Sequence, residues 1–293
     1  MTGSPLRYPG GKALMTSFLV DLFRANNMHH ITYAEPYAGG AGAAINLLLS
    51  NVVDRILIND ANIGVYSFWY YLTTEPERFI QNVIAIPVTL EQWHIEHQIV
   101  STATEPSLEL GVATFFLSRT NRSGVISAGP IGGSSSEKQK NATYKIDCRF
   151  NKENLVARLR QIAERADRVF VTNLDAIDFL RGLEPNAFVY LDPPYYVKGK
   201  CLYMNHYRHR DHEQLATFLL YDALFKWVLS YDDVQEIRQL YGVLKLYNFP
   251  LCYTVQGVRI GMELMTHSKN VVLPERLEIR KSRLTNIPIT AIN

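Results

Sequence analysis

Hydrophobic and polar positions in the first 60 residues alternate between helical and strand-like spacing. Apolar side chains recur at helical intervals through residues 13–24, which predicts an amphipathic helix. Short apolar runs at 31–34 and 55–59 are typical of buried strands, and the small and apolar residues at 43–49 predict a helix between them. The chain therefore begins with the strand–helix–strand order of an α/β fold.

The pattern changes after this opening unit. Helical spacing at 66–84 and 90–100 leads into a polar, glycine-rich segment from 119 to 145, whose composition is typical of a flexible loop. Long helical stretches without intervening strands do not extend an alternating sheet. We therefore predict that residues 66–149 form a mainly helical insertion.

Strand-like runs and helical stretches alternate again after about residue 150, and residues 243–273 alternate in a way that predicts antiparallel strands. Alternation of this kind predicts a mostly parallel sheet with helices on both faces. The predicted fold class is therefore α/β, with one sheet domain built from 1–65 and 150–293.

Composition narrows the protein class. The chain has 293 residues, of which 47% are hydrophobic, enough for one large domain or one domain with an insertion. No apolar run approaches the ~18 residues of a membrane span, and the start lacks the apolar core of a signal peptide. The three cysteines are far apart, so we expect reduced thiols in a cytoplasmic protein without membrane contact. A net charge of +2 neither requires nor excludes nucleic acid.

The most informative motif is Asp192-Pro193-Pro194-Tyr195, directly after the apolar run 188–191. Proline fixes φ at about −65° and has no N–H, so carbonyl groups here face a ligand without a competing donor. The Asp192 carboxylate and a proline carbonyl can accept both hydrogens of a planar amino group, while Tyr195 stacks on the ring that carries it. The alternative is purely structural, because Asp-Pro-Pro also ends strands and begins turns.

A second motif is the glycine-rich segment 35–42, which lies between a predicted strand and a predicted helix and is followed by Asp60. Glycines let the backbone approach a ligand, and an acid about 20 residues further on can hold ribose hydroxyls. The segment does not follow Gly-x-Gly-x-x-Gly, so a plain strand-to-helix turn is the alternative. At the carboxyl ends of one parallel sheet, an adenosine cofactor would face an amino group. This combination indicates methyl transfer from S-adenosylmethionine.

Six segments occur in a characteristic order: Tyr8-Pro9-Gly10-Gly11-Lys12, Glu35-Pro36-Tyr37-Ala38-Gly39-Gly40, Asn59-Asp60, Arg119-Thr120-Asn121-Arg122-Ser123-Gly124, Arg149-Phe150-Asn151-Lys152 and Asp192-Pro193-Pro194-Tyr195. Over nearly the whole chain this order resembles the Dam-like class of adenine-N6 DNA methyltransferases, which implies a Rossmann-like sheet. The glycine loop departs from the Phe-x-Gly-x-Gly form of the family's most studied members. This difference leaves the backbone contacts of the loop open.

The resemblance implies a role for each motif. The catalytic residues would be Asp192, Pro193, Pro194 and Tyr195. The cofactor S-adenosylmethionine would be held by Tyr8, Lys12, Glu35, Pro36, Tyr37, Gly39, Gly40, Asp60 and Asp175. In this set Lys12 would pair with the methionine carboxylate and Asp60 with the ribose hydroxyls. Asp175 would contact the adenine amine of the cofactor, or would cap the short helix that ends near residue 180.

A basic segment is expected to contact DNA. Residues 119–149 carry six basic side chains against two acidic ones, a local charge of +4 that suits phosphate contacts. Dam-type enzymes place a groove-reading hairpin here, and the predicted DNA-binding residues are Arg119, Asn121, Arg122, Ser123, Lys138, Lys140 and Lys198. The alternative is a solvated loop with ordinary lysines.

Residues around the catalytic motif allow other interpretations. Tyr196 repeats the motif tyrosine, and we favour packing over a place in the target pocket. His206, His209 and His212 lie at a spacing that is no strong metal signature, so we expect no metal site. We expect these histidines to be polar loop residues near DNA.

The predicted function is methylation of N6 of a flipped adenine in duplex DNA. Similar motifs also serve cytosine-N4, RNA-adenine and protein-glutamine methylation, and a DNA-binding protein with a degenerate methyltransferase core is a further alternative. The expected setting is the cytoplasm of a bacterium or a phage-infected cell, with the protein acting as a monomer; a cognate restriction endonuclease is a candidate partner. The sequence does not specify the recognition site or whether a restriction partner exists.

Overall fold

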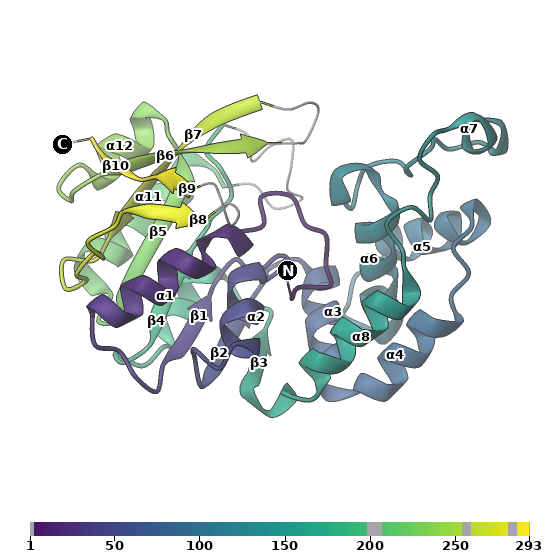
Figure 1. The fold of residues 1–293 in the computed structure, drawn as a ribbon, viewed down its shortest axis with the longest axis horizontal. Coiled ribbons are helices and arrows are strands. Elements are labelled where there is room, and N and C mark those ends of the chain that lie inside the picture. The colour runs from purple at the N-terminus through teal and green to yellow at the C-terminus, as the bar shows by residue number, and fades with distance from the viewer. Residues whose placement is uncertain (1–2, 198–206, 254–258, 281–285, 293) are drawn as a thin grey trace.

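In the described residues, eight strands form one central sheet with helices on both faces (Figure 1). The computed structural model describes residues 3–197, 207–253, 259–280 and 286–292, with the backbone alone at 251–253 and 259–260. The strand order is β10-β6-β7-β5-β4-β1-β2-β3. The strands are β1 (Thr32–Glu35), β2 (Arg55–Asn59), β3 (Val169–Thr172), β4 (Phe188–Leu191), β5 (Lys226–Asp232), β6 (Tyr247–Tyr253), β7 (Arg259–His267) and β10 (Thr290–Ala291).

The sheet is parallel on one side and antiparallel on the other. The neighbours β3, β2, β1, β4 and β5 run parallel, whereas β7 is antiparallel to β5 and β6, and β10 is antiparallel to β6. A separate pair joins β8 (Glu278–Arg280) to β9 (Asn286–Pro288). The mostly parallel α/β sheet and the antiparallel strands near the end of the sequence are therefore confirmed.

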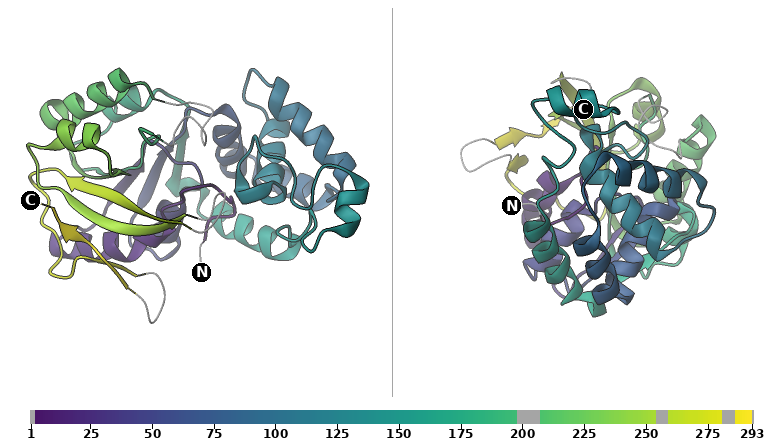
Figure 2. Two further views of the ribbon diagram at one scale, coloured as in Figure 1. Left: turned by 90° about the horizontal axis from the view of Figure 1, so that it is seen from above. Right: turned by 90° about the vertical axis from the view of Figure 1, so that its right-hand side faces the viewer.

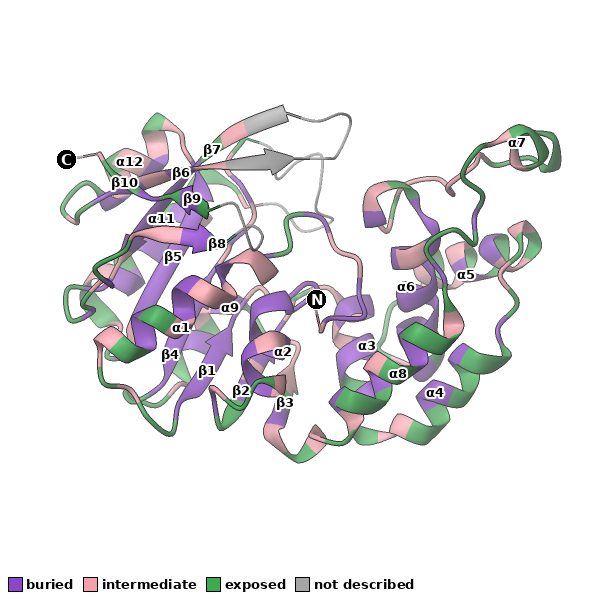
Figure 3. Cartoon of the chain, in the orientation of Figure 1, coloured by how far each residue is buried: buried purple, intermediate pink, exposed green. Residues whose placement is uncertain are grey.

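Both faces of the sheet are buried, as the alternation in β4 shows. Phe188 and Tyr190 belong to one buried apolar cluster, and Val189 and Leu191 belong to another on the opposite face. The first face is covered by α1 (Thr16–Ala25) and α2 (Gly42–Leu49), and the second by α9 (Ala176–Arg181), α11 (His209–Thr217), a π-helix (Phe218–Asp222) and α12 (Gln235–Tyr241). Figure 3 shows the central strands β1, β4 and β5 as buried.

A helical part lies beside the sheet (Figure 2). Its helices are α3 (Ile63–Thr74), α4 (Pro76–Ala85), α5 (Leu90–Thr102), α6 (Leu108–Thr120), α7 (Ser136–Asn141) and α8 (Lys152–Ala163). Short 3-10 turns occur at Ala13–Met15, Arg122–Gly124 and Ala166–Arg168. In the helical core, Phe68 of α3 stacks on Phe115 of α6 at 5.6 Å between ring centroids. These rings belong to the same buried cluster as the first face of the sheet, so one apolar core runs through both parts.

The helical part also contacts the glycine loop directly. Trp69 of α3 is fully buried and donates its indole N–H to the carbonyl of Gly39 at 2.9 Å. Helix α3 begins at Ile63, before the predicted boundary at residue 66, and α8 packs against α4 although it follows the predicted boundary at 149. The division into 1–65, 66–149 and 150–293 stays a prediction.

Two expectations, on membrane-spanning segments and on the cysteines, can be compared with the structure. None of the helices in the described part of the chain has the length and apolarity that a membrane crossing needs. Cys148 is exposed and unbonded. Cys201 and the side chain of Cys252 lie outside the described residues.

The contact between α3 and α6 depends on Gly111, and we predict that Gly111→Ala destabilises the protein. A Cβ at this position would lie 2.8 Å from the backbone oxygen of Ser67, closer than two helix backbones tolerate. Alanine gains about 1 kcal/mol in helix propensity, but overpacking costs about 1–3 kcal/mol. Thermal unfolding should therefore give a lower midpoint for Gly111→Ala than for the wild type. Gly182→Ala, whose Cβ would meet no atom closer than 3.4 Å, is the control; equal midpoints for all three proteins would contradict the packing argument.

Candidate active site

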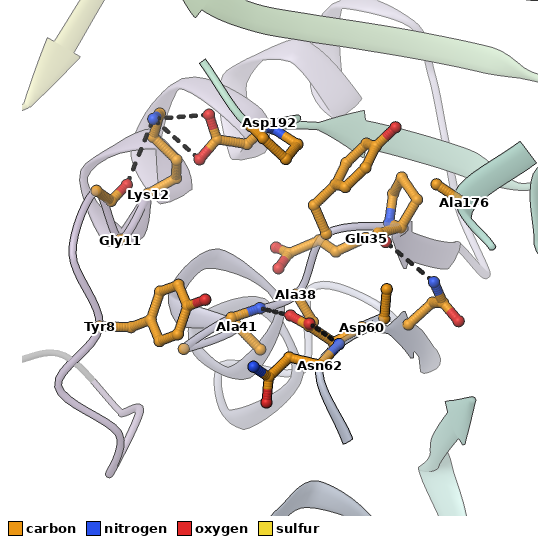
Figure 4. A pocket seen from close by; sticks show the side chains of 18 of the residues that line it. Tyr8, Gly11, Lys12, Glu35, Ala38, Ala41, Asp60, Asn62, Ala176 and Asp192 are labelled. Atoms are coloured by element: carbon orange, nitrogen blue, oxygen red, sulfur yellow. Dashed lines mark hydrogen bonds and ion pairs between the residues drawn. The ribbon is translucent and has the colours of Figure 1, made fainter. Parts of the chain in front are cut away.

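A pocket opens at the carboxyl ends of β1, β2 and β4, where parallel α/β sheets bind ligands (Figure 4). Its walls include every side chain or backbone segment that was predicted to hold the cofactor, namely Tyr8, Lys12, Glu35, Pro36, Tyr37, Gly39, Gly40, Asp60 and Asp175. Asp192 and Pro194 of the predicted catalytic motif line the same pocket. Tyr8 and Pro194, which are 186 positions apart in sequence, therefore meet at one edge of the sheet.

The glycine loop is bent tightly at this edge. Gly39 has φ of +45°, and a Cβ there would lie 2.7 Å from the ring of Tyr8. Ala41, which precedes α2, also adopts the left-handed region, with φ of +44°. The loop is thus shaped by a close approach of Tyr8 that only glycine at position 39 accommodates.

Asp60 joins the loop to the start of the helical part. One carboxylate oxygen accepts the Gly39 N–H at 2.8 Å and the other accepts the Asn62 N–H at 2.9 Å. Asn62 in turn caps α3 by accepting the N–H groups of Gly64 and Val65. Burial raises the pKa of Asp60 to about 6, although both backbone donors favour its charged form.

Asp175 caps a helix and also lines the pocket. Its side chain caps α9 by accepting the Ile177 N–H at 2.8 Å, and it also lies in the wall of the pocket. The structural and ligand-binding interpretations are therefore compatible at this position.

Glu35 lies at the end of β1 with most of its side chain buried. One oxygen accepts the Tyr33 hydroxyl at 2.9 Å and the Ala44 N–H at 3.0 Å. Burial raises the pKa of Glu35 to about 8 despite these two donors. The carboxyl group therefore holds a proton at neutral pH in the unliganded protein.

Asp192 at the end of β4 is paired with a buried lysine. The Lys12 ammonium lies 2.8 Å from one carboxylate oxygen of Asp192 and 3.0 Å from the other (Figure 4). It also lies 3.3 Å from a carboxylate oxygen of Glu263. Burial opposes the charge on Lys12, but Asp192 and Glu263 outweigh it and raise the pKa of the ammonium well above its ordinary value. Burial raises the pKa of Asp192 to about 6, while Lys12 acts in the opposite direction. Lys12 was predicted to pair with a methionine carboxylate; here its ammonium binds two carboxylates of the protein.

Tyr195 turns away from the pocket into the same cluster. Its side chain is 2% exposed, its hydroxyl donates to Glu263, and Lys12 donates to that hydroxyl at 2.9 Å. Pro193 is also buried, whereas Pro194 reaches the pocket wall. The catalytic role of residues 192–195 stays a prediction. In this arrangement Lys12 holds the Asp192 carboxylate, and the Tyr195 ring is buried in the interior.

Comparison with known proteins identifies the family. Residues 8–252 match the D12 class of N6 adenine-specific DNA methyltransferases. The chain belongs to this family. It is also 27% identical, over 209 residues, to the modification methylase StsI of Streptococcus sanguinis, a match that covers 66% of this chain and 29% of that relative. The chain thus spans less than a third of the curated relative it matches. The resemblance to adenine-N6 DNA methyltransferases is confirmed.

Four residues around this site lie in none of the motifs recognised in the sequence. Glu263, Asp232 and Ser230 contact residues of the segment 192–197. Tyr207 lines the pocket beside Tyr37, with 2.8 Å between the two hydroxyls. An acid between apolar neighbours, as at Glu263, is a usable signal, because buried carboxylates need partners. Tyr207 follows a polar stretch of sequence, and no motif distinguishes it.

The histidine prediction is wrong at one position. His212 was expected in a polar loop near DNA, but it lies buried in α11 with Nδ1 at 2.7 Å from the Tyr231 hydroxyl. Burial lowers the pKa of His212 to about 4, so the ring is neutral. His209 is exposed, His206 lies outside the described residues, and Tyr196 packs on both His209 and His212. No cluster of metal-ligating side chains occurs in the part of the chain that is described.

The residues predicted to contact DNA fall into two groups. Arg122, Lys138 and Lys140 are exposed, and Ser123 lies on a turn with φ of +57°. Asn121 is 0% exposed, because its side chain accepts the Trp93 indole N–H and donates to the carbonyls of Val125 and Ile126. Arg119 donates to the Pro5 carbonyl, and burial lowers its pKa to about 10. These two side chains hold the loop and the N-terminal segment in place. Lys198 lies outside the described residues, and a DNA contact by any of the seven stays a prediction.

We predict that Glu35→Gln flattens the pH dependence of stability. The pKa of Glu35 is about 8 in the folded protein and about 4.3 in an unfolded chain. Between these values the folded state keeps a proton that the unfolded state releases. The free energy of unfolding of the wild type therefore falls as the pH rises, by at most about 1.4 kcal/mol per unit from this group. Urea unfolding of the unliganded proteins from about pH 5 to about pH 8 measures the difference, with the exposed Glu105→Gln as control. Parallel curves for wild type and Glu35→Gln would contradict it.

Proposed function

We propose that this chain transfers a methyl group from S-adenosylmethionine to N6 of an adenine flipped out of duplex DNA. The observation that carries the proposal is the position of Asp192. Its carboxylate, the acceptor that a planar amine requires, lies in one pocket with the glycine loop and Asp60. Membership of the D12 class supports the same conclusion.

The lining of the pocket suits the proposed cofactor. The carboxyl groups of Asp60 and Asp175 are acceptors for ribose hydroxyls and for an adenine amine. Tyr8, Tyr37 and Tyr207 supply flat apolar faces for a purine. A purine nucleoside with a cationic sulfonium group matches this donor and acceptor set, and that group supplies an activated methyl when it is bound.

The reaction requires a better nucleophile than an aromatic amine. The lone pair of adenine N6 is delocalised into the ring. Hydrogen bonds from the two N6 hydrogens to the Asp192 carboxylate and the Pro193 carbonyl favour a more tetrahedral nitrogen, whose lone pair leaves the ring. The ionised carboxylate of Asp192 is the stronger acceptor for such a bond, and Lys12 favours that form. Catalysis is thus mainly positioning and charge stabilisation.

Duplex DNA would contact the exposed basic side chains of the helical part. Arg122, Lys138, Lys140, Lys145 and Arg149 are all exposed. Flipping the base costs a few kcal/mol of stacking, and stacking on Tyr195 would offset part of this once the ring leaves its buried position. The protein would act as a monomer in the cytoplasm of a bacterium or a phage-infected cell, either alone or with a cognate restriction endonuclease.

We predict that Asp192→Ala abolishes methyl transfer and leaves cofactor binding nearly intact. Loss of the acceptor should lower kcat by about a thousandfold, whereas the remaining pocket wall is unchanged. Incorporation of labelled methyl groups into duplex DNA gives the rate, and calorimetry gives the cofactor affinity. The exposed Asp178→Ala in α9 is the control for loss of an acid. Transfer by Asp192→Ala near the wild-type rate would refute the assignment, and nucleoside analysis that finds N4-methylcytosine in place of N6-methyladenine would refute the target.

We also predict that Lys138→Ala combined with Lys140→Ala weakens DNA binding through phosphate contacts alone. Each contact contributes about 0.9 to the slope of log affinity against log salt concentration, so the slope should fall by about 1.8. Fluorescence titrations at several salt concentrations measure this slope. The exposed Lys269→Ala is the control, and an unchanged slope in the double variant would remove α7 from the DNA interface.

A further inference from the structure

Two buried acids face one another across β5 and β7. Asp232 and Glu263 are direct partners in the antiparallel register, and their exposed fractions are 5% and 0%. Side chains that lie opposite in an antiparallel pair share a face of the sheet, where like charges destabilise the pairing. Burial adds a desolvation cost to each carboxylate. The stability of the sheet therefore does not explain why two acids lie opposite one another at this point.

Both acids accept hydrogen bonds from residues that directly follow Asp192-Pro193-Pro194, and Glu263 also accepts one from Lys12. Glu263 accepts from the Tyr195 hydroxyl and, at 3.3 Å, from the Lys12 ammonium. Asp232 accepts the backbone N–H of Tyr196 at 2.9 Å and that of Val197 at 3.1 Å, one with each oxygen. The two acids thus hold three consecutive residues directly after Asp192-Pro193-Pro194.

We propose that Asp232 and Glu263 are positioning residues of the methyltransferase, which together fix residues 192–197 and hold the Lys12 ammonium against Asp192. This inference rests on the proposed function, since it concerns how the catalytic carboxylate and Tyr195 are held for that reaction. Neither acid lies in a motif that the sequence analysis identified. They act through Lys12, Tyr195 and the backbone, and neither lines the pocket.

The Glu263 carboxylate sets the charge around Asp192. Glu263 and Asp192 both form an ion pair with the Lys12 ammonium, so one positive charge is paired with two negative charges. The negative charge of Glu263 raises the pKa of Asp192, after burial, and Lys12 lowers it. The groups that face Asp192 from the elements around it are Lys12, Tyr195, Tyr190 of β4, Ser230 and Tyr231 of β5, Glu263 of β7, and Tyr33 and Glu35 of β1.

The first experiment measures the titration of Asp192 in the unliganded protein. The ¹³C resonance of its carboxyl group is identified as the one missing in Asp192→Asn. We expect Glu263→Gln to lower the apparent pKa by about one unit and Lys12→Met to raise it by a similar amount. The matched control is Glu96→Gln, another buried acid, which lies in α5 far from this segment in sequence. A titration that is the same in Glu263→Gln and Glu96→Gln would overturn the role of Glu263.

The second experiment measures kcat, the cofactor affinity and the thermal midpoint for the same variants on DNA. Glu263→Gln and Asp232→Asn should each lower kcat about tenfold, the scale of one charge-assisted hydrogen bond, with cofactor affinity unchanged. In Asp232→Asn one acceptor becomes an amide donor that faces a backbone N–H. A fall in the thermal midpoint at unchanged kcat would show a structural role only and would overturn the proposal.

A double-mutant cycle tests whether Glu263 acts through Tyr195. Tyr195→Phe removes only the hydroxyl group, which donates a hydrogen bond to Glu263, and keeps the ring. If the two groups act as one unit, Tyr195→Phe should lower kcat in the wild type and have no further effect in Glu263→Ala. Additive losses would contradict a shared role.

Failure of this inference is distinguishable from failure of the proposed function. Wild-type protein that transfers no methyl group to any duplex would refute the proposed function, while the carboxyl titration is measured without cofactor or DNA. An active wild type with unaltered Glu263→Gln and Asp232→Asn variants would refute the positioning roles alone.

Discussion

The site depends on one buried ammonium. The Nζ atom of Lys12 joins the N-terminal segment to Asp192 after β4 and to Glu263 in β7. Each carboxylate alone would carry an effective desolvation penalty of several kcal/mol, and a buried charge that loses its partner is strongly destabilising. One ammonium between two carboxylates leaves a net charge of −1 beside the pocket. The Lys12 ammonium favours the anionic form of Asp192, whereas the negative charge of Glu263 opposes it.

The cost of this arrangement is visible in the surrounding sheet. Asp232 and Glu263 oppose one another in register, and Gly39 and Ala41 lie in the left-handed region. Local rules of pairing and backbone geometry are broken around one pocket, as is usual where function rather than stability selects a residue. The two large apolar clusters on the faces of the sheet offset these costs.

Local signals in the sequence predicted the elements well. The strand predicted at 55–59 coincides with β2, and both motifs lie at the carboxyl ends of parallel strands, as predicted. These features were predictable because apolar runs and glycine turns are local properties of the sequence. Partners distant in sequence were not predictable in this way. Glu263 is 251 positions from Lys12, and no spacing rule connects them. Burial of polar groups was also missed: Asn121 and His212 look like surface residues by type, yet tertiary packing places both in the interior.

The contact between Trp69 and Gly39 has a consequence for how such enzymes diverge. Helix α3 is connected to the glycine loop in two ways. The Trp69 indole contacts Gly39 directly, and the cap residue Asn62 is linked to Gly39 through Asp60. An exchange of recognition regions between relatives is therefore constrained at its first junction. A chimera cut at residue 66 would divide α3 from its own cap and place a foreign side chain against the glycine loop. A junction after α3 leaves these contacts with the sheet, so the helices beyond α3 can be exchanged while the glycine loop keeps its supports.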